Sequence, residues 1–287
     1  MDFDRNETLD EARERNVRDA LFEDIGLGDW TARLVPAGRR VTARVIVREP
    51  AVLCGRDWFG ACMTALDPAA QLRWHHDEGA EPQPGDTVCT ISADARALLS
   101  AERPALNFLQ LLSGTATITR RHVRAIEGAS PNPRGCAVLD TRKTIPGLRQ
   151  AQKYAVRVGG GRNQRLALWN GILIKENHIA AAGGIAPVLA QARALQAGVE
   201  IQIEVETLEQ LREALDAGAT SVLLDNFDTQ RMREAVALTG GRALLEASGG
   251  VGLDRLRDIA ATGVDRISIG KLTKDVLAVD YSLRVVD

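Results

Sequence analysis

Long apolar runs, a secretory leader pattern and an excess of positive charge are all missing from this chain of 287 residues. No apolar run approaches the ~20 residues that a membrane-spanning helix needs, so we expect no membrane insertion. The first residues are acidic and lack the basic-then-apolar order of a signal peptide. The formal net charge is −2 and the sequence pI is near 6.2. That balance argues against a nucleic-acid partner, because such a surface needs a basic face.

Cysteine and histidine are also scarce, with four of each. The cysteines are widely spaced and form no Cys-x-x-Cys pair, which indicates free thiols in a reducing compartment and hence a cytoplasmic protein. The pair His75-His76 has no further ligands at the spacing of a metal site, so we interpret it as a polar strand end. No Ser-His-Asp or Cys-His arrangement occurs at a recognisable spacing.

The chain is long and apolar enough, at 45% hydrophobic residues, to bury a large core in one domain or two. The apolar spacing predicts helices over 8–22 and 106–126, with strands near 41–53, 72–76 and 87–91. These elements follow no regular order, which indicates a first α/β domain over 1–113. The long helix would bridge it to a second domain over 114–272.

The second domain shows a regular alternation of strand-like and helical segments, which is typical of parallel βα units. Six strands without the full eight predict an incomplete TIM-like βα barrel, and a doubly wound open sheet is the competing architecture. The expected strands are 137–139, 172–174, 201–205, 221–224, 243–245 and 266–269, and the expected helices are 186–196, 208–217, 229–238 and 253–262.

Four cations stand close to the ends of the early strands in this pattern, although the chain as a whole is slightly acidic. They are Arg142, Lys143, Arg165 and Lys175. Active sites of βα barrels lie at the carboxyl ends of the strands, and a lone charge is costly to desolvate there. The cluster therefore predicts an anionic ligand that carries carboxylates, phosphates or both.

Carboxylates and glycine turns follow the later strands. Glu204 and Asp225 could bind magnesium, hold ribose hydroxyls or stabilise a cationic transition state. Glu206 shares a face with Glu204 in a regular strand, so periodicity alone leaves both open. The turns are Ser248-Gly249-Gly250 and Ile269-Gly270-Lys271. They stand where this fold often builds a phosphate site from backbone N–H groups.

Several long motifs, in order, resemble those of the quinolinate phosphoribosyltransferase family, the carboxylating nicotinate-nucleotide pyrophosphorylases of NAD synthesis. The resemblance covers nearly the whole chain and is densest from Glu102 onward. The motifs are Glu102-Arg103-Pro104-Ala105-Leu106-Asn107-Phe108, Asp140-Thr141-Arg142-Lys143-Thr144, Leu173-Ile174-Lys175-Glu176-Asn177-His178, Leu224-Asp225-Asn226-Phe227 and Ser248-Gly249-Gly250.

The resemblance implies a fold and a role for each candidate residue. It implies an N-terminal α/β domain joined to an incomplete βα barrel, with segment 273–287 folding back onto the first domain. Lys143, Glu204 and Asp225 would be catalytic, and the two carboxylates would hold magnesium mostly through substrate and water. Quinolinate would be held by Arg103, Arg142, Arg165 and Lys175, and Lys143 would lie near the reacting centre between the two substrates. Glu204 and Asp225 would hold the ribose side, and the turns Ser248-Gly249-Gly250 and Ile269-Gly270-Lys271 would hold the ribose phosphate; Thr141 would also bind substrate.

The implied reaction transfers phosphoribosyl from phosphoribosyl pyrophosphate to quinolinate, with loss of carbon dioxide. The resemblance also implies a homodimer or larger assembly in which Arg103 reaches the partner's site. The alternatives are another phosphate-sugar barrel enzyme, the related paralogue associated with molybdenum transport, and a non-catalytic ligand-binding protein.

Two positions depart from the pattern of the family. Gln164 stands where the family usually has histidine in Gly-Gly-Gly-x-Asn-His-Arg. Glutamine can donate a hydrogen bond to a carboxylate but cannot carry charge, so we assign it no catalytic role. Pro104 stands where threonine is common, and we expect it in the first turn of the long helix.

Overall fold

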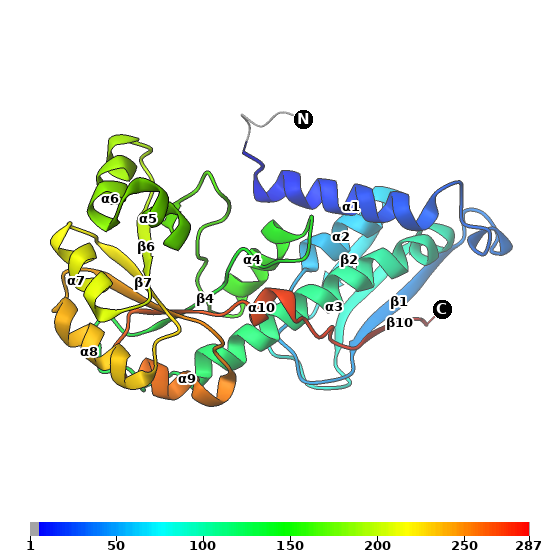
Figure 1. Cartoon of the computed structure of the whole chain (residues 1–287). Coiled ribbons are helices and arrows are strands. Elements are labelled where there is room, and N and C mark those ends of the chain that lie inside the picture. Colours follow the sequence, from blue (N-terminus) through cyan, green and yellow to red (C-terminus); the bar gives the residue numbers. More distant parts are fainter. Residues whose placement is uncertain (1–5, 287) are drawn as a thin grey trace. The chain divides into compact units, whose positions relative to one another are not determined.

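The computed structural model describes residues 6–286 and separates into two compact units (Figure 1). Unit 1 contains residues up to 120, residues 144–160 and residues from 272 onward. Unit 2 contains residues 121–143 and 161–271. No helix among the described residues is long and apolar enough to cross a membrane.

Unit 1 is built on an antiparallel sheet in the order β10-β1-β3-β2. The strands are β1 (Arg40–Val47), β2 (Gln71–Trp74), β3 (Thr87–Asp94) and β10 (Tyr281–Val285). Burial alternates strictly along β1, so one face of the strand packs on the core and the other does not. The C-terminal segment thus returns to this sheet, because β10 pairs with β1 from Val47 opposite Tyr281 to Ala43 opposite Val285.

Helices pack on this sheet and enclose one apolar core (Figure 1). They are α1 (Leu9–Ile25), α2 (Arg56–Leu66), the greater part of α3 (Ala95–Ala125) and α4 (Arg149–Val158). The single turn η1 (Ala32–Leu34) contributes no residue to this core, and its Leu34 is 83% exposed. A capping box begins α1, since the Thr8 hydroxyl accepts from the Glu11 N–H and the Glu11 carboxylate accepts from the Thr8 N–H. Cys54, Cys62 and Cys89 are buried free thiols, as expected for a reduced protein.

The long helix α3 begins eleven residues before the predicted start. The Asp94 carboxylate caps the helix by accepting from the N–H groups of Arg96 and Ala97, at 3.0 and 3.1 Å. Pro104 consequently lies inside the helix, and the expectation of a first-turn position is wrong. Because proline has no N–H, that turn lacks one hydrogen bond, and burial of the neighbouring side chains Ala105 and Leu106 holds the helix in place.

Unit 2 contains a parallel sheet in the order β4-β9-β8-β7-β6-β5. The strands are β4 (Ala137–Leu139), β5 (Ile172–Ile174), β6 (Ile201–Val205), β7 (Ser221–Asp225), β8 (Leu244–Ser248) and β9 (Arg266–Ser268). From β5 to β9 each strand lies beside its successor, and the first strand β4 pairs with the last, β9. A doubly wound sheet would reverse its order at a switch point, so this order is that of a barrel open between β4 and β5.

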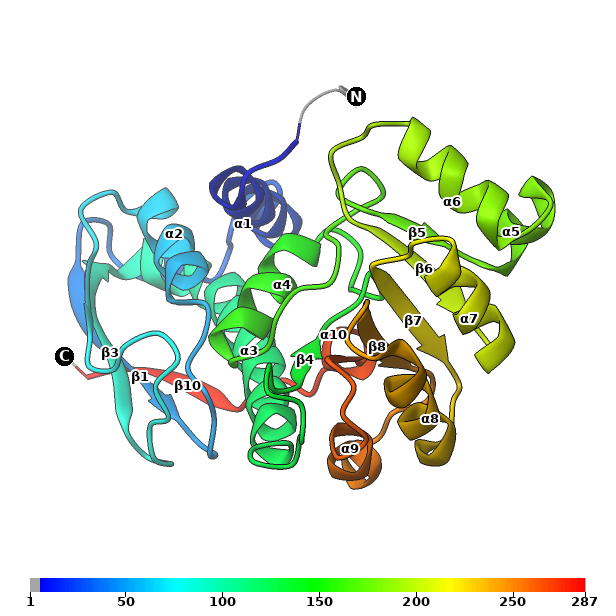
Figure 2. The same ribbon diagram turned by 90° about the vertical axis from the view of Figure 1, so that its left-hand side faces the viewer.

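Helices alternate with these strands and lie along their outer side (Figure 2). They are α5 (Glu176–Ala182), α6 (Ile185–Ala194), α7 (Leu208–Asp216), α8 (Thr229–Thr239) and α9 (Leu253–Ala260). The short helix α10 (Lys271–Lys274) begins at the last residue of unit 2 and continues in unit 1. The side chains of Thr207 and Asp228 cap α7 and α8 by accepting from backbone N–H groups.

The division into units differs from the expected domains mainly in two segments, because unit 1 extends to residue 120 rather than 113 and also includes residues 144–160. Residues 144–160, which the sequence pattern assigns to the barrel domain, belong to unit 1. The cause is the apolar face of α4, because Ala151 and Ala155 are fully buried within the core of unit 1. The segment after β4 therefore does not continue the βα pattern of unit 2.

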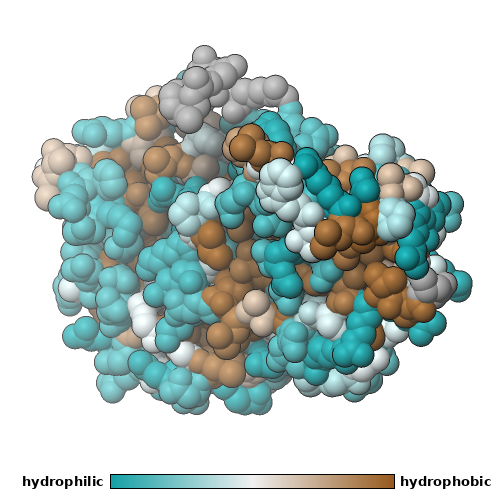
Figure 3. Space-filling model, turned by 90° about the vertical axis from the view of Figure 1, so that its right-hand side faces the viewer, coloured by the Kyte–Doolittle hydropathy of each residue, from teal (hydrophilic) through white to brown (hydrophobic). Residues whose placement is uncertain are grey.

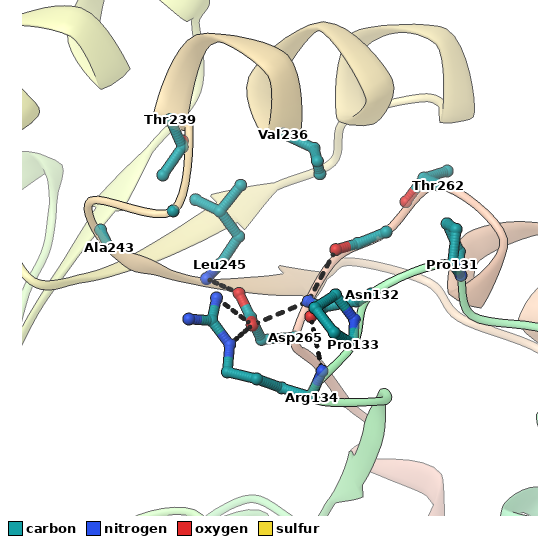
Figure 4. Close-up of a pocket in the computed structure, with 12 residues that line it drawn as sticks. Pro131, Asn132, Pro133, Arg134, Val236, Thr239, Ala243, Leu245, Thr262 and Asp265 are labelled. Carbon is teal, nitrogen blue, oxygen red and sulfur yellow. Dashed lines mark hydrogen bonds and ion pairs between the residues drawn. The ribbon is translucent and has the colours of Figure 1, made fainter.

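A buried aspartate lies at the end of the barrel where the strands begin, opposite the candidate site positions. Asp265 precedes β9, accepts from the Leu245 N–H through Oδ2 at 2.8 Å, and accepts from Asn132 and Arg134 through Oδ1 at 2.9 Å each (Figure 4). These groups line a cavity of ≈ 400 Å³ whose other walls include Pro131 and Val236. Since the charged groups there satisfy one another, we interpret the cluster as a structural clamp between β4, β8 and β9.

We predict that Asp265→Asn lowers the free energy of unfolding by about 2 kcal/mol, because it removes the charge from several hydrogen bonds of a buried carboxylate. Urea titration followed by circular dichroism measures the change. Asp216→Asn is the matched control, since its ion pair with Arg242 is exposed and 3.7 Å long, and it should shift stability by less than about 0.5 kcal/mol. Equal effects of the two changes would contradict the clamp.

Candidate active site

Two guanidinium groups approach each other beyond the end of β4. Arg142 stands three residues after β4, and Arg165 lies in the loop that precedes β5. Burial, followed by the nearby positive charge of Arg142, lowers the pKa of Arg165 from its ordinary value. Like charges that converge in a partly buried place indicate that this part of the site is built for an anion.

The loop that contains Arg165 is fixed to the end of β4. Arg162 forms an isolated parallel bridge with Leu139. The fully buried Asp140 carboxylate accepts from the Asn163 side chain at 2.6 Å and from the Gln164 N–H at 2.9 Å. Arg165 itself donates to the Gly171 carbonyl at 3.0 Å. The positions of both arginines thus depend on the same strand end.

Lys175 and Glu204 form an ion pair between neighbouring strand ends. The Lys175 Nζ lies 3.0 Å from Glu204 Oε2 and 3.3 Å from Oε1. The Lys175 side chain is 45% exposed and the Glu204 side chain 11%, so the lysine lies toward solvent and the carboxylate beneath it. The Lys175 N–H donates to His178 Nδ1 at 3.1 Å, which caps the start of α5.

Asp225 belongs to a polar group that spans the ends of β7 and β8. Its carboxylate accepts from the Asn226 side chain at 2.9 Å, and the Asn226 N–H donates to the Ser248 carbonyl at 3.1 Å. Asn226 has a positive φ of 57°, and a Cβ added to Gly249 would collide with its side chain. Only glycine therefore fits position 249, where φ is +102°.

The turn after β9 completes the ring of strand ends. A Cβ added at Gly270 would lie 3.1 Å from Lys143 Cδ and 3.6 Å from Thr141 Oγ1. The glycine therefore leaves room for the Lys143 side chain, while the Lys143 N–H donates to Thr141 Oγ1 at 3.0 Å. Ile269 is buried and its N–H donates to the Leu139 carbonyl at 2.9 Å, whereas Lys271 is exposed at the start of α10.

Most of the residues predicted from the sequence thus follow the carboxyl ends of six neighbouring strands in unit 2. Cations follow β4 and β5, carboxylates end β6 and β7, and glycine turns follow β8 and β9. This division can hold a carboxylate ligand beside the cations and a phosphate at the turns. Between them lie carboxylates able to stabilise positive charge.

Two predicted candidates lie apart from this group. Arg103 is an exposed residue of α3 in unit 1, so unit 2 alone does not contain it. Glu206, which periodicity left open beside Glu204, is exposed past the end of β6, and its N–H donates to Gln210 at 2.7 Å. Glu204, which pairs with Lys175, is therefore the carboxylate that we retain as the candidate site residue.

The sequence interpretation did not single out several polar residues that support the site. Asp140, Asn163 and Asn226 fix its loops, as described above. Gln202 and Glu246 are buried at 4% and 1% exposure. They stand two residues before Glu204 and Ser248, on the same face of their strands. Polar residues at every second position of β6 and β8 were the sequence signal that could have identified Gln202 and Glu246.

Within residues 6–286 no three His, Cys, Asp or Glu side chains are grouped so that they could hold a metal ion. Glu204 and Asp225 fit magnesium in a more limited way. One or two carboxylates suffice when substrate phosphates and water supply the other ligands, which is the usual form of a magnesium site at a phosphorylated substrate.

Family models match almost the whole chain. The model described as "Quinolinate phosphoribosyl transferase, C-terminal domain" matches residues 115–284, and the corresponding N-terminal domain model matches residues 29–113. The chain belongs to the quinolinate phosphoribosyl transferase family. The two models meet at 113–115, within α3, the helix that passes from unit 1 into unit 2.

Individual relatives agree with this family assignment. The chain is 41% identical to the nicotinate-nucleotide pyrophosphorylase [carboxylating] of Mycobacterium leprae, covering 96% of this chain and 97% of the relative. It is 40% identical to the probable enzyme of the same name from Bacillus subtilis, covering 92% and 90%. The structure of the nicotinate-nucleotide pyrophosphorylase from Francisella tularensis matches with a TM-score of 0.92, at 41% identity and full coverage of both chains.

We predict that Gly249→Ala weakens the binding of inorganic phosphate about tenfold, because strained backbone and the collision with Asn226 displace the turn. Isothermal titration calorimetry measures the affinity. Gly241→Ala is the control, since its φ is also positive, at +77°, but an added Cβ there meets nothing within 4 Å. Unchanged phosphate binding by Gly249→Ala would remove the turn from the phosphate site.

Proposed function

We propose that this protein is the carboxylating nicotinate-nucleotide pyrophosphorylase of NAD synthesis. It transfers phosphoribosyl from phosphoribosyl pyrophosphate to quinolinate, and releases pyrophosphate and carbon dioxide. The observation that carries the proposal is the order of side chains at the carboxyl ends of neighbouring strands: Arg142 and Lys143 follow β4, and Lys175 follows β5 and pairs with Glu204 of β6. Arg165 lies near Arg142, whose positive charge lowers the pKa of Arg165. Quinolinate has two adjacent carboxylates, and these would offset the charge of the paired guanidinium groups.

The chemistry begins with orientation of the pyridine ring. Arginine binds a carboxylate through two parallel N–H bonds, so two arginines can fix the plane of the ring as well as its position. The exposed Lys175 side chain can supply a further contact while Glu204 holds it. The ring nitrogen is thereby directed at the anomeric carbon of phosphoribosyl pyrophosphate, which lowers the entropic part of the barrier.

Positive charge develops on the ribose as pyrophosphate leaves. Glu204 and Asp225 are the carboxylates of the site, and their negative charge would stabilise an oxocarbenium-like transition state. Lys143, which passes beside Gly270, would offset the negative charge of the departing pyrophosphate. The glycine turns 248–250 and 269–271 would bind the ribose phosphate through backbone N–H groups.

Loss of carbon dioxide follows from the charge on the ring. Once the nitrogen bonds to ribose it is a cationic pyridinium, and the electron pair left by carbon dioxide is stabilised on the adjacent carbon. A proton then replaces the carboxylate and gives nicotinate mononucleotide. The protein needs only to hold the departing carboxylate of quinolinate until carbon dioxide leaves, and the cations of the site can do this.

Magnesium is part of this proposal as an ion that arrives with the pyrophosphate substrate. Glu204 and Asp225 would contribute to its ligands, directly or through water. When bound, the ion would offset negative charge on the leaving group.

We further propose a homodimer or larger assembly in the cytoplasm, with Arg103 contributed to the partner's site. The support is that Arg103 is exposed and that four large apolar side chains are exposed within residues 22–34: Phe22, Leu27, Trp30 and Leu34. Apolar side chains also gather in patches on the face drawn in Figure 3. Such surfaces are typical of protein interfaces.

The test incubates the purified protein with magnesium and phosphoribosyl pyrophosphate, and with either quinolinate or nicotinate. Pyrophosphate and nicotinate mononucleotide are measured. We expect turnover with quinolinate and none with nicotinate, because the second carboxylate is needed for binding. Turnover with neither acid would refute the proposal and favour a binding protein or the paralogue associated with molybdenum transport.

We predict that Arg142→Ala weakens quinolinate binding by about 1.5–3 kcal/mol, the value of one charge-assisted contact. The KM for quinolinate and its calorimetric affinity should both change by about tenfold to a hundredfold. Arg242→Ala is a suitable control, since that arginine is half exposed and lies before β8, at the other end of the strand from the site. Wild-type affinity in Arg142→Ala would exclude the role.

We predict that Glu204→Gln lowers kcat about 10²-fold or more, as expected for loss of electrostatic stabilisation in the transition state. The KM for quinolinate should change less. Glu206→Gln tests the neighbouring exposed carboxylate and should leave both constants near their wild-type values. A larger change in quinolinate KM than in kcat would instead place Glu204 in the quinolinate pocket.

A further inference from the structure

A chain of hydrogen-bonded side chains crosses the interior of unit 2 beneath the candidate site. Gln164 Nε2 donates to Gln202 Oε1 at 3.1 Å, and Gln202 Nε2 donates to Glu246 Oε2 at 2.9 Å. Gln202 and Glu246 are almost completely buried, on β6 and β8. Every donor in this chain points away from the loop and toward the Glu246 carboxyl group.

The layer that Gln202 and Glu246 form lies one step below the site residues. Side chains two positions apart share a face of a strand, so Gln202 lies below Glu204 and Glu246 below Ser248. The two strands are separated by β7, whose Leu223 is the register partner of both Glu204 and Glu246. In register Glu246 is thus level with Glu204, but the strands of a barrel are tilted to its axis, which brings Glu246 to the level of Gln202 inside the barrel. The 2.9 Å hydrogen bond between the two side chains shows that they meet there.

The upper end of the chain connects to the loop that carries Arg165. Gln164 is the residue immediately before Arg165, and its N–H donates to the buried Asp140 carboxylate. Gln164 is thus held at two points, by its backbone at β4 and by its side chain at β6. Such double attachment fixes the direction in which the next residue leaves the loop.

The two hydrogen bonds of Gln164 hold the loop against two unfavourable effects at Arg165. Arg165 lies near Arg142 and is partly buried, so repulsion and desolvation both favour movement of the loop away from the strand ends. Polar groups buried in a barrel are costly unless they are bonded. Glu246 Oε1 has no hydrogen-bond partner among the described residues, and burial raises the pKa of this carboxyl group. Glu246 Oε2 also lies 3.8 Å from Arg266 Nε, so the carboxyl group has a cationic neighbour in addition to Gln202.

We propose that Gln202 and Glu246 are positioning residues of the substrate site. They act through Gln164 to hold Arg165 in place, and they set the affinity for the dianionic pyridine substrate. This inference rests on the proposed function, because it concerns the same pocket. Neither residue touches the substrate, so their removal should change substrate affinity and spare the later chemistry.

The experiment compares variants that break the chain with one that keeps it. Gln202→Leu and Glu246→Leu remove one link each, and Gln164→Leu removes the upper link from a half-buried position in the loop. Glu246→Gln keeps an oxygen that accepts from Gln202. Thr262→Val is the matched control, because Thr262 is 4% exposed and its hydroxyl donates only to the Ile259 carbonyl, away from the site.

We expect the three Leu variants to raise the KM for quinolinate about tenfold, as loss of a buried hydrogen bond would. The KM for phosphoribosyl pyrophosphate and kcat should stay within about twofold of wild type. Glu246→Gln and Thr262→Val should behave like wild type in all three constants. Thermal unfolding of each variant separates a change in stability from a change in affinity.

Several results would overturn the inference. One is an unchanged quinolinate KM in Leu variants that fold, and another is an equal rise in the KM of both substrates. A Glu246→Gln variant as impaired as Glu246→Leu would equally refute it. If Gln202→Leu fails to fold, the KM of Gln164→Leu for quinolinate tests the inference instead. Wild-type protein that does not convert quinolinate would refute the proposed function itself, which is a separate and earlier result.

Discussion

Asp140 provides the attachment on which the candidate site depends. This carboxylate is fully buried directly after β4, and it accepts from the Asn163 side chain and the Gln164 N–H. The residues that follow it carry Arg142 and Lys143, and the residue after Gln164 is Arg165. Two segments separated by about twenty positions in the sequence are therefore held together by this carboxylate and by the backbone bridge between Leu139 and Arg162. The side-chain attachment is what fixes the loop directly before Arg165.

The ends of parallel strands supply the rest of the arrangement. Several strand ends contact their neighbours: the Lys175 side chain pairs with Glu204, the Asn226 N–H donates to the Ser248 carbonyl, and the Lys143 side chain passes beside Gly270. Because all strands of the sheet run in one direction, residues placed similarly in each βα unit meet at one edge. The chemistry is divided around that edge into cations, carboxylates and glycine turns. A substrate with carboxylates on one side and phosphates on the other fits this division.

The strands of unit 2 could be predicted well from the sequence. Those over 137–139, 172–174 and 201–205 agree with β4, β5 and β6, because buried β-branched runs bounded by turn residues are a strong local signal. The start of α3 could not be predicted in the same way. Asp94 ends a strand and caps a helix at once, and Pro104 looked like a helix start when it is an interior residue. Both errors arose because local preference was overridden by burial of the neighbouring turns.

The sequence by itself determined which residue types stand at the strand ends, since the cations, carboxylates and glycines of the candidate site follow from a periodic pattern. It also determined the family, through long motifs in the correct order. Only the tertiary structure decided which residues are paired and which support them. Lys175 is bound to Glu204, and Gln164 is linked to Glu246 through Gln202, across strands that are far apart in the chain. Such contacts depend on strand order and on side chains that meet inside the barrel, and no local spacing in the sequence records either.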